Sequence, residues 1–316
     1  SQKGVIGIIG AGNFTNMTVL PHLKSIGAQI KIIASSGGAS GTQCAKKYRI
    51  SQSTTNYKEI FDDDDIDTVF ITTRHGSHSK LVIESLKAGK NTFVEKPLAL
   101  NIDQLDQIVE TYKIQQKSSS SKMLAIGFNR RFSPHLIKIK KSMGDNLSSV
   151  NIIANMNAGF IPNDHWVHDL DSGGGRIIGE ACHLMDVCVY LTGSMIKSVC
   201  MSGLGDSPKI DTDNASILLK FENGSNAVIN YFSNGSKKYS KERVEVYSLE
   251  RTWIMDNYKI TEAFGVKGFR TLKTKIDKGH KNQFDKFIQR IQDGGGPLIK
   301  FDEILNVTKA SYAAIE

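Results

Sequence analysis

The sequence predicts an α/β domain with a parallel sheet, followed by an α+β domain with a large, mostly antiparallel open sheet. From residue 4 to about residue 127, short β-branched apolar runs alternate with helix-compatible stretches, as in parallel sheets with crossover helices. Beyond residue 128 this alternation stops, and strand-like runs follow one another at 149–157, 215–221, 226–232 and 242–248. The runs 215–221 and 226–232 are separated by "ENGS" (222–225), which is a hairpin signal. We therefore expect two domains, at 1–127 and 128–316.

Length and composition exclude several classes of protein. The 316 residues suffice for two domains, and an apolar content of 40% supports packed cores. The sequence has no run of about 18 apolar residues and no visible signal peptide, so we expect a cytoplasmic protein without a membrane partner. It begins without Met and ends in a helix-like stretch, so we also expect it to be excised from a longer protein.

Charge and cysteine content say less about partners. The net charge of +8 comes from scattered lysines rather than a basic stripe interleaved with aromatics, so we expect no nucleic-acid partner. An anionic small molecule would suit this charge, and a basic solvated surface explains it equally simply. The four cysteines form no CxxC pair, which predicts reduced thiols and no structural zinc.

The first 35 residues form one strand, glycine turn, helix and strand unit. "GVIGIIG" (4–10) is followed at once by "GAGNFT" (10–15), and "AQIKIIAS" (28–35) supplies the second strand. Gly10 permits the tight turn, and Gly12 removes a side chain where a pyrophosphate must approach. The helix N-terminus at Asn13 and Phe14 offers N–H groups to the phosphates, so we predict a bound NAD or NADP. Pro21 should kink this helix.

The end of the second strand bears on the choice of dinucleotide. An acid there would hold the ribose 2′-OH and repel a 2′-phosphate, but "SSGGASG" (35–41) contains none. Ser35 and Ser36 can bond either form of the ribose, and Lys46 or Lys47 is placed to approach a phosphate. NAD and NADP both stay open.

Two further strands place polar residues at the same edge of the sheet. "DTVFITT" (67–73) ends at Thr73, Arg74 and His75, and "NTFV" (91–94) ends at "EKP". Ligands bind beyond the carboxyl ends of parallel strands, so we expect both segments to face the cofactor. The Lys-Pro bond is a candidate for the cis form.

Five motifs in order resemble the Gfo/Idh/MocA family of oxidoreductases, named for glucose-fructose oxidoreductase, inositol dehydrogenase and rhizopine catabolism. They are the glycine turn, "TRHGSH" (73–78), "AGKNTFVEKP" (88–97), "FNRRFSP" (128–134) and "GGGRIIGEACHLMD" (173–186). The resemblance implies an N-terminal Rossmann domain and an α+β domain that binds substrate and forms a homo-oligomer, a dimer or tetramer, through its sheet. The implied activity is hydride transfer between NAD(P) and a secondary alcohol or ketone of a sugar or nucleotide-sugar.

The resemblance also implies roles for individual residues. Thr73 and His78, with Glu95, Lys96 and Pro97, would line the cofactor site. Lys96 would lie near the reacting hydroxyl and stabilise a developing alkoxide, with Glu95 orienting it or bonding the ribose.

In the glycine-rich motif the resemblance implies a proton-accepting His183. The family's Asp position is Gly179 here, so the usual Asp–His pair is broken. Glu180 would compensate only if a helix begins there, because one residue along a helix turns the side chain by about 100°. A structural histidine is the alternative for His183, and a cap or salt bridge is the alternative for Glu180 and Asp186.

Substrate contacts are expected from a cluster just before the glycine run. "NDHWVHD" (163–169) holds His165, Trp166 and His168, and a Trp face stacks on sugar rings. Two histidines and an acid also suit a metal, but no further close ligand is evident, so we expect none. Arg131 and Arg176 are candidates for an anionic part of the substrate, with surface ion pairs as the alternative.

Two other classes of function stay open. Gly179 favours a family member that binds dinucleotide without turnover, as a sensor or as the partner module of a larger oxidoreductase. Elimination or hydrolysis by redox cycling would instead predict a cofactor that survives purification.

Overall fold

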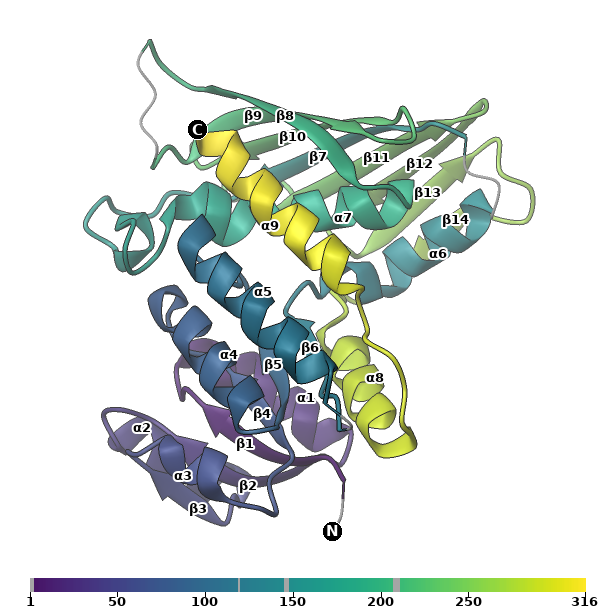
Figure 1. The fold of residues 1–316 in the computed structure, drawn as a ribbon. Helices are drawn as coiled ribbons and strands as arrows, with labels where there is room; N and C mark the ends of the chain where they lie inside the picture. The colour runs from purple at the N-terminus through teal and green to yellow at the C-terminus, as the bar shows by residue number, and fades with distance from the viewer. Residues whose placement is uncertain (1–2, 119, 145–147, 207–210) are drawn as a thin grey trace. The chain divides into compact units, whose positions relative to one another are not determined.

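The computed structural model describes residues 3–118, 120–144, 148–206 and 211–316, shown as a ribbon in Figure 1. Contacts divide the chain into two compact units. Unit 1 comprises the residues up to Gly127 together with His280–Phe301, and unit 2 comprises Phe128–Gly279 and Asp302–Glu316. Each unit has its own sheet.

Unit 1 is built on a six-stranded parallel sheet with the order β3-β2-β1-β4-β5-β6. Its strands are β1 (Val5–Ile9), β2 (Gln29–Ala34), β3 (Gln52–Thr54), β4 (Thr68–Ile71), β5 (Asn91–Val94) and β6 (Leu124–Ile126). Its helices are α1 (Leu20–Ser25), α2 (Ala39–Tyr48), α3 (Lys58–Asp62), α4 (His78–Lys87), α5 (Ile102–Gln116) and α8 (His280–Asp293). Strands β1, β4 and β5 are buried along their whole length, as expected for strands covered on both faces.

The helix after β1 differs from the expected kinked α-helix. A π-helical turn, η1 (Thr15–Val19), precedes α1, and Pro21 lies in the first turn of α1. Proline has no N–H with which to close an α-helical bond to the carbonyl four residues earlier, so a wider turn at this point is physically consistent.

Residues 280–301, expected in the second domain, lie in unit 1. Helix α8 places Phe284 and Phe287 edge-on against Phe70 of β4, with ring centroids 5.5 and 5.9 Å apart. Phe284 also meets Phe93 of β5 at 5.2 Å. Burial of these aromatic rings on the sheet of unit 1 therefore places α8 in unit 1, although α8 follows every strand of the second sheet in the sequence.

Unit 2 contains an eight-stranded sheet with the order β14-β13-β12-β11-β7-β10-β9-β8. The strands are β7 (Asn151–Asn157), β8 (Ile196–Gly203), β9 (Asn214–Phe221), β10 (Asn226–Phe232), β11 (Glu242–Ser248), β12 (Arg251–Asp256), β13 (Ile260–Phe264) and β14 (Thr271–Lys273). All its ladders are antiparallel except the β7–β10 pair. The hairpin expected at 222–225 is confirmed, since β9 and β10 pair antiparallel around it. The predicted fold class is confirmed.

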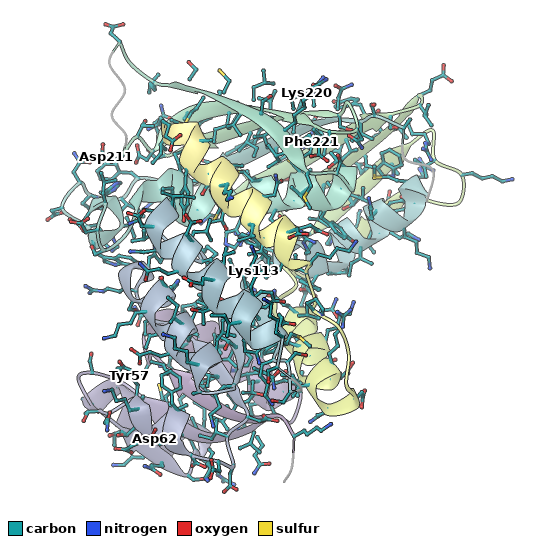
Figure 2. The ribbon with its side chains drawn as sticks, in the orientation of Figure 1. Tyr57, Asp62, Lys113, Asp211, Lys220 and Phe221 are labelled. Atoms are coloured by element: carbon teal, nitrogen blue, oxygen red, sulfur yellow. The ribbon has the colours of Figure 1, made fainter. Side chains whose placement is uncertain are left out.

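The two faces of this sheet differ. Helices α6 (Pro134–Met143), α7 (Cys182–Thr192) and α9 (Phe301–Ile315) lie along one face (Figure 1). Neighbouring residues of β9 alternate accordingly: Phe221 is buried, whereas Lys220 is exposed on the other face (Figure 2). In the described ranges of the chain, no helix is long and apolar enough to span a membrane.

Candidate dinucleotide and catalytic sites

The turn after β1 requires glycine at its first position. Gly10 has φ +112°, and a Cβ there would lie 2.8 Å from the carbonyl carbon of Thr72 and 2.9 Å from its oxygen. The backbone of Gly10 is fixed from the other side by a bond from its N–H to Ala34 O at 2.9 Å. The Thr15 hydroxyl shares a 2.7 Å hydrogen bond with that of Thr72, so this buried side chain ties the start of the helix to the end of β4.

The next residues of the turn fit a dinucleotide. Nothing lies within 4 Å of a Cβ added at Gly12, apart from its own chain neighbours, so the space in front of it is open. Asn13 and Phe14 precede η1, and the N–H groups of a first helical turn lack intrahelical acceptors. Such groups bind phosphate oxygens, so these residues would hold the pyrophosphate of NAD or NADP.

The end of β2 carries neutral hydroxyls, as the sequence indicated. The N–H of Ser35 donates to Thr54 O at 3.0 Å, and its Oγ shares a 2.8 Å hydrogen bond with Ser40 Oγ. Ser36 is exposed. The Lys47 ammonium donates to Asn16 Oδ1 at 3.2 Å.

The segment after β4 is tied to the segment after β5 through His78. Its Nδ1 lies 2.7 Å from Pro97 O and its Nε2 lies 3.0 Å from Thr73 O. Burial lowers the pKa of this imidazole, and the two carbonyls oppose that shift. The Thr73 hydroxyl bonds Ser77 at 2.6 Å, and exposed Arg74 precedes the 3-10 turn η2 (His75–Ser77). The role that these contacts support for His78 is to position the two loops.

The end of β5 places Glu95 and Lys96 at the carboxyl edge of the sheet. Ile9, Ile71 and Val94 are partners across β1, β4 and β5, so the glycine turn and Glu95 follow neighbouring positions of the sheet. The expected cis bond between Lys96 and Pro97 is confirmed.

Glu95 also has a neighbour that sequence reasoning missed. A Cβ added at Gly127 would lie 2.6 Å from Glu95 Oε2 and 2.7 Å from Oε1. The carboxylate therefore lies directly over the backbone after β6, where any side chain would displace it. The glycine inside the apolar run "MLAIGF" (123–128) was the available signal.

In unit 2, His183 lies in the first turn of α7. Only 4% of its surface is exposed, and its ring meets Phe128 edge-on at 6.3 Å. The preceding turn, η5 (Ile177–Ala181), is π-helical and contains buried Gly179. Helical backbone thus starts before Glu180, so the condition under which Glu180 would replace the missing Asp is not met.

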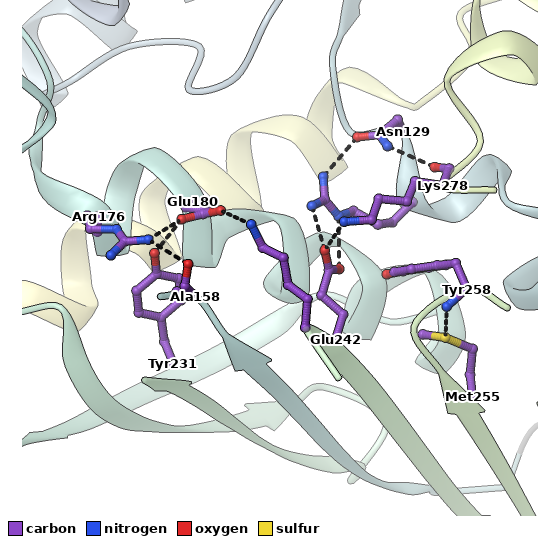
Figure 3. A network of polar contacts seen from close by, with 11 residues as sticks. Asn129, Ala158, Arg176, Glu180, Tyr231, Glu242, Met255, Tyr258 and Lys278 are labelled. Atoms are coloured by element: carbon purple, nitrogen blue, oxygen red, sulfur yellow. Dashed lines mark hydrogen bonds and ion pairs between the residues drawn. The ribbon is translucent and has the colours of Figure 1, made fainter. Parts of the chain in front are cut away.

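The carboxylate of Glu180 is held by three other groups (Figure 3). Its Oε2 accepts from Arg176 Nη2 at 3.0 Å and from the Tyr231 hydroxyl. Lys241 Nζ lies 3.7 Å from its other oxygen. Burial and the Glu180 charge raise the pKa of Tyr231, so the phenol stays protonated and donates. A catalytic role for Glu180 stays a prediction, and these contacts favour the salt-bridge alternative.

The two candidate anion-binding arginines are engaged inside unit 2. Arg131 donates from Nε to Asp186 Oδ2 at 3.0 Å and from Nη1 to Glu303 Oε2 at 2.8 Å, and 7% of its side chain is exposed. Arg176 also donates to Gly159 O at 2.7 Å, and 3% of its side chain is exposed. Both guanidinium groups are buried and ion-paired within unit 2, whereas surface pairs were the alternative expected; a substrate contact for either arginine stays a prediction.

The cluster at 163–169 is a loop around the 3-10 turn η4 (Trp166–His168). His165 is exposed, its ring lies 5.7 Å from that of Trp166, and His168 Nε2 lies 3.3 Å from Ile161 O. A Cβ at Gly173 would come within 2.4 Å of Trp166 O, so the glycine run packs directly on this loop. Across the residues that the structure describes, no group of three His, Cys, Asp or Glu side chains could hold a metal.

Sequence reasoning also missed a second buried network in unit 2 (Figure 3). Fully buried Glu242 accepts from Arg130 Nε at 3.1 Å and Nη2 at 2.9 Å, and from Lys278 Nζ at 2.8 Å. Asn129 Nδ2 donates to Lys278 O at 2.8 Å. The network joins the two segments at which the chain enters and leaves unit 2.

The two domains together define a class of protein. The first has a parallel sheet with a glycine turn, an open first helical turn and a lysine at one edge, and the second has a mostly antiparallel sheet. This class is that of two-domain, dinucleotide-binding oxidoreductases.

Known proteins resemble the chain in both of its domains. Residues 5–122 match the model of an oxidoreductase family with an NAD-binding Rossmann fold, and residues 148–252 match the GFO/IDH/MocA C-terminal domain. The chain is 28% identical over 271 residues to an uncharacterized oxidoreductase, YrbE, of Bacillus subtilis, with 83% of this chain and 76% of that protein covered. It is 26% identical over 274 residues to myo-inositol 2-dehydrogenase of Thermotoga maritima, with 81% and 78% covered.

A solved structure shares the fold. Levoglucosan dehydrogenase in complex with NADH and levoglucosan has a TM-score of 0.85 at 20% identity, with 98% of this chain and 96% of that chain covered. The chain belongs to the Gfo/Idh/MocA oxidoreductase family, and its first domain is an NAD-binding Rossmann domain. The family and the nicotinamide cofactor expected from the sequence are confirmed.

Proposed function

We propose that this chain is an NAD(P)-dependent dehydrogenase that oxidises a secondary alcohol of a sugar or polyol, or reduces the corresponding ketone. The observation that carries the proposal is the register of β1, β4 and β5 in unit 1. It brings the open turn at Gly12 and the Glu95–Lys96 pair to one edge of one sheet. A lysine delivered to the cofactor edge is suited to an alcohol, whose proton must leave as hydride does.

Two side chains of this chain would handle the proton. The bound nicotinamide supplies the chemistry of accepting hydride from the carbinol carbon. The Lys96 ammonium would stabilise negative charge on the substrate oxygen as its O–H bond weakens. The imidazole of His183 would take that proton as a general base. The alcohol thereby loses one hydride and one proton and becomes a ketone.

The buried ion pairs favour a neutral substrate. The guanidinium groups of Arg131 and Arg176 would be the natural partners of a diphosphate or carboxylate, but both bind carboxylates of unit 2. An additional anion would have to displace one of these carboxylates from a buried guanidinium, which typically costs several kcal/mol. Among relatives, names such as myo-inositol 2-dehydrogenase and levoglucosan dehydrogenase describe neutral compounds. We therefore place neutral cyclic polyols and sugars ahead of nucleotide-sugars.

The test is a substrate panel with a matched pair of lysine variants. Purified protein is mixed with inositols, neutral sugars, an anhydrosugar and a nucleotide-sugar, with NAD⁺ or NADP⁺, and absorbance is followed at about 340 nm, where reduced nicotinamides absorb. We expect turnover with a neutral polyol. Lys96→Ala should lower kcat by about two orders of magnitude or more, with the dinucleotide Kd changed by no more than about fivefold.

Lys87→Ala is the control, because Lys87 is an exposed lysine on α4. It should leave kcat unchanged. Equal kcat values for wild type and Lys96→Ala would remove Lys96 from the mechanism.

Gly179 supports a second candidate, a dinucleotide-binding protein without turnover. The buried glycine in η5 leaves no carboxylate at the family's Asp position beside His183. The two candidates differ in one result. Tight dinucleotide binding with no absorbance change across the whole panel would favour the sensor or partner module, whereas turnover with any polyol excludes it.

We also propose a homo-oligomer, a dimer or tetramer, formed through the exposed face of the sheet of unit 2. On that face Leu218, Val228 and Ile153 are direct partners across β9, β10 and β7, and Leu218 is 52% exposed. Light scattering after size exclusion should give a multiple of the chain mass. Leu218→Glu should lower it, and Lys87→Glu in unit 1 should not. A monomeric wild type would contradict the proposal.

A further inference from the structure

The residue that follows β2 decides which form of the adenosine ribose a Rossmann domain accepts. A carboxylate there bonds the 2′-OH and repels a 2′-phosphate. In this chain the position belongs to Ser35, whose N–H is anchored to Thr54 O at 3.0 Å and whose Oγ bonds Ser40 Oγ at 2.8 Å. A neutral hydroxyl, held against the first turn of α2, therefore occupies the place of the selective acid.

The surrounding part of the sequence offers no substitute carboxylate. Residues 1–61 contain seven lysines and arginines but a single acid, Glu59. Glu59 accepts a hydrogen bond from Gln52, the first residue of β3, at 2.9 Å. Because β2 and β3 are parallel, with Ala34 opposite Thr54, that acid belongs to the amino end of β3, away from Ser35.

The next acids along the chain have other partners. Asp63 and Asp65 both bind Lys31 of β2, with a closest approach of 2.7 Å in each case. The Lys31 ammonium compensates one of these two charges and holds both carboxylates at the middle of β2, four residues before Ser35. The first acid at the carboxyl edge of the sheet is Glu95, three strands away from β2 in the order of the sheet.

The segment between β2 and α2 also leaves room for a phosphate. Residues 35–42, "SSGGASGT", contain no side chain larger than threonine, and a Cβ added at Gly37 would meet nothing within 4 Å. Gly38 precedes α2 with φ +70° and provides no side-chain cap. The hydroxyls of Ser35, Ser36 and Ser40 can all donate hydrogen bonds to phosphate oxygens.

The described contacts give the two lysines of α2, Lys46 and Lys47, no acidic partner. Lys47 Nζ contacts the neutral Asn16 Oδ1 at 3.2 Å and lies 5.0 Å from the centre of the Tyr48 ring. Lys46 is exposed on the same helix. Both lysines lie in the last turn of α2, so they would contribute only a long-range attraction for a dianion, which salt screens beyond about 8 Å at physiological ionic strength.

We propose that the end of β2 accepts a 2′-phosphate, so that this chain binds NADP(H) at least as tightly as NAD(H), with Ser35 as the specificity-determining residue. The proposal rests on the dinucleotide cofactor of the proposed function and adds the choice between its two forms.

The experiment is calorimetric titration of the protein with NADPH and, separately, NADH, without any substrate, so that the readout is independent of turnover. In the wild type we expect a ratio of Kd(NADPH) to Kd(NADH) of about 1 or less. Ser35→Asp should raise this ratio by about 30-fold or more, since a carboxylate next to a phosphate is strongly unfavourable. Ser51→Asp is the control, because it adds the same charge at an exposed position just before β3. That position is at the amino ends of the strands, whereas Ser35 is at their carboxyl ends.

Each outcome decides the proposal. A wild-type ratio above about 3 would overturn it, and this measurement stands even if Ser35→Asp does not fold. Equal shifts of the ratio in Ser35→Asp and Ser51→Asp would remove Ser35 as the determinant. Binding of neither nucleotide would contradict the dinucleotide function itself, whereas tight NADH binding with weak NADPH binding would contradict only this inference.

Discussion

Replacing Glu242 by Gln should destabilise unit 2 strongly, because in the described contacts its carboxylate is the only acidic partner of buried Arg130 and partly buried Lys278. Glu242 is fully buried and accepts three hydrogen bonds, two from Arg130 and one from Lys278, all between 2.8 and 3.1 Å. Glutamine keeps the shape but removes the charge and turns an NH₂ group toward these donors. Breaking a buried ion pair on one side typically costs about 3–5 kcal/mol.

The cost should come mainly from Arg130. Burial lowers the pKa of Lys278, and Glu242 opposes that shift, so without the carboxylate the amine loses its proton more easily. A guanidinium cannot follow, since its pKa stays above 12. For a unit of roughly 150–250 residues, about 3–5 kcal/mol corresponds to a fall in Tm of about 6–20 °C.

Tryptophan fluorescence is a selective assay for this change. The chain has two tryptophans, Trp166 and Trp253, and both belong to unit 2. Glu245→Gln is a matched control on the same strand, because Glu245 pairs with half-buried Arg243 on the exposed face and should contribute about 1 kcal/mol at most. Equal unfolding midpoints for Glu242→Gln and Glu245→Gln at pH 7 would refute the reasoning.

The stabilisation that Glu242 gives through Arg130 and Lys278 should depend on pH in a defined way. Burial alone would raise the pKa of Glu242, but Arg130 and Lys278 outweigh it and hold the pKa well below its usual range. A carboxyl with a lowered folded-state pKa contributes its stabilisation in full above the unfolded value of about 4.3 and loses it as the pH falls toward the folded value. The difference between wild type and Glu242→Gln should therefore be constant from about pH 6 to 8 and shrink below about pH 4. A difference that grows on acidification would contradict this assignment.

Three further substitutions test the sites. Gly10→Ala should lower the free energy of unfolding by about 2–4 kcal/mol and abolish dinucleotide binding, because its Cβ would lie 2.8 Å from the Thr72 carbonyl carbon. Thermal unfolding followed by circular dichroism and a dinucleotide titration measure the two effects. A titration curve equal to that of the wild type would contradict the prediction. Gly127→Ala should displace the Glu95 carboxylate and lower kcat about tenfold or more, and an unchanged rate would separate Glu95 from catalysis. His183→Asn should remove the neutral-pH limb of the kcat/KM profile, and a persistent limb would identify another base.

Much of unit 1 was predictable because its strands are short, mostly apolar or β-branched runs bounded by glycine and charged residues. The run 5–9 and the run 91–94 both became buried strands, and the residues after them reached the same sheet edge. Such strands depend on local composition and on the parallel topology, and both are visible in the sequence.

Long-range pairing was beyond the sequence. The return of α8 to unit 1 depends on Phe284 and Phe287 meeting Phe70 and Phe93, which lie about 200 residues earlier. The parallel pairing of β7 with β10 has the same character, since the hydrophobic pattern of a strand does not identify its neighbour.

Charged residues near the predicted site were the least predictable. Arg131 and Arg176 had the right position in the motifs to meet an anion, yet each found a carboxylate within unit 2. Glu180 sits beside the missing Asp position in sequence, and its contacts go to Tyr231 and Arg176. Which acid satisfies a buried cation depends on packing, and packing has no short sequence signature.

The most direct test of the proposed function follows a single hydrogen. The polyol that reacts fastest in the substrate panel is prepared with deuterium at its reacting carbinol carbon, and the reduced nicotinamide is analysed by mass spectrometry after turnover. Our account predicts one deuterium on the nicotinamide ring for each ketone formed, at a rate greatly reduced in Lys96→Ala. Reduced nicotinamide without deuterium, or tight nucleotide binding with no reduction by any polyol, would contradict it.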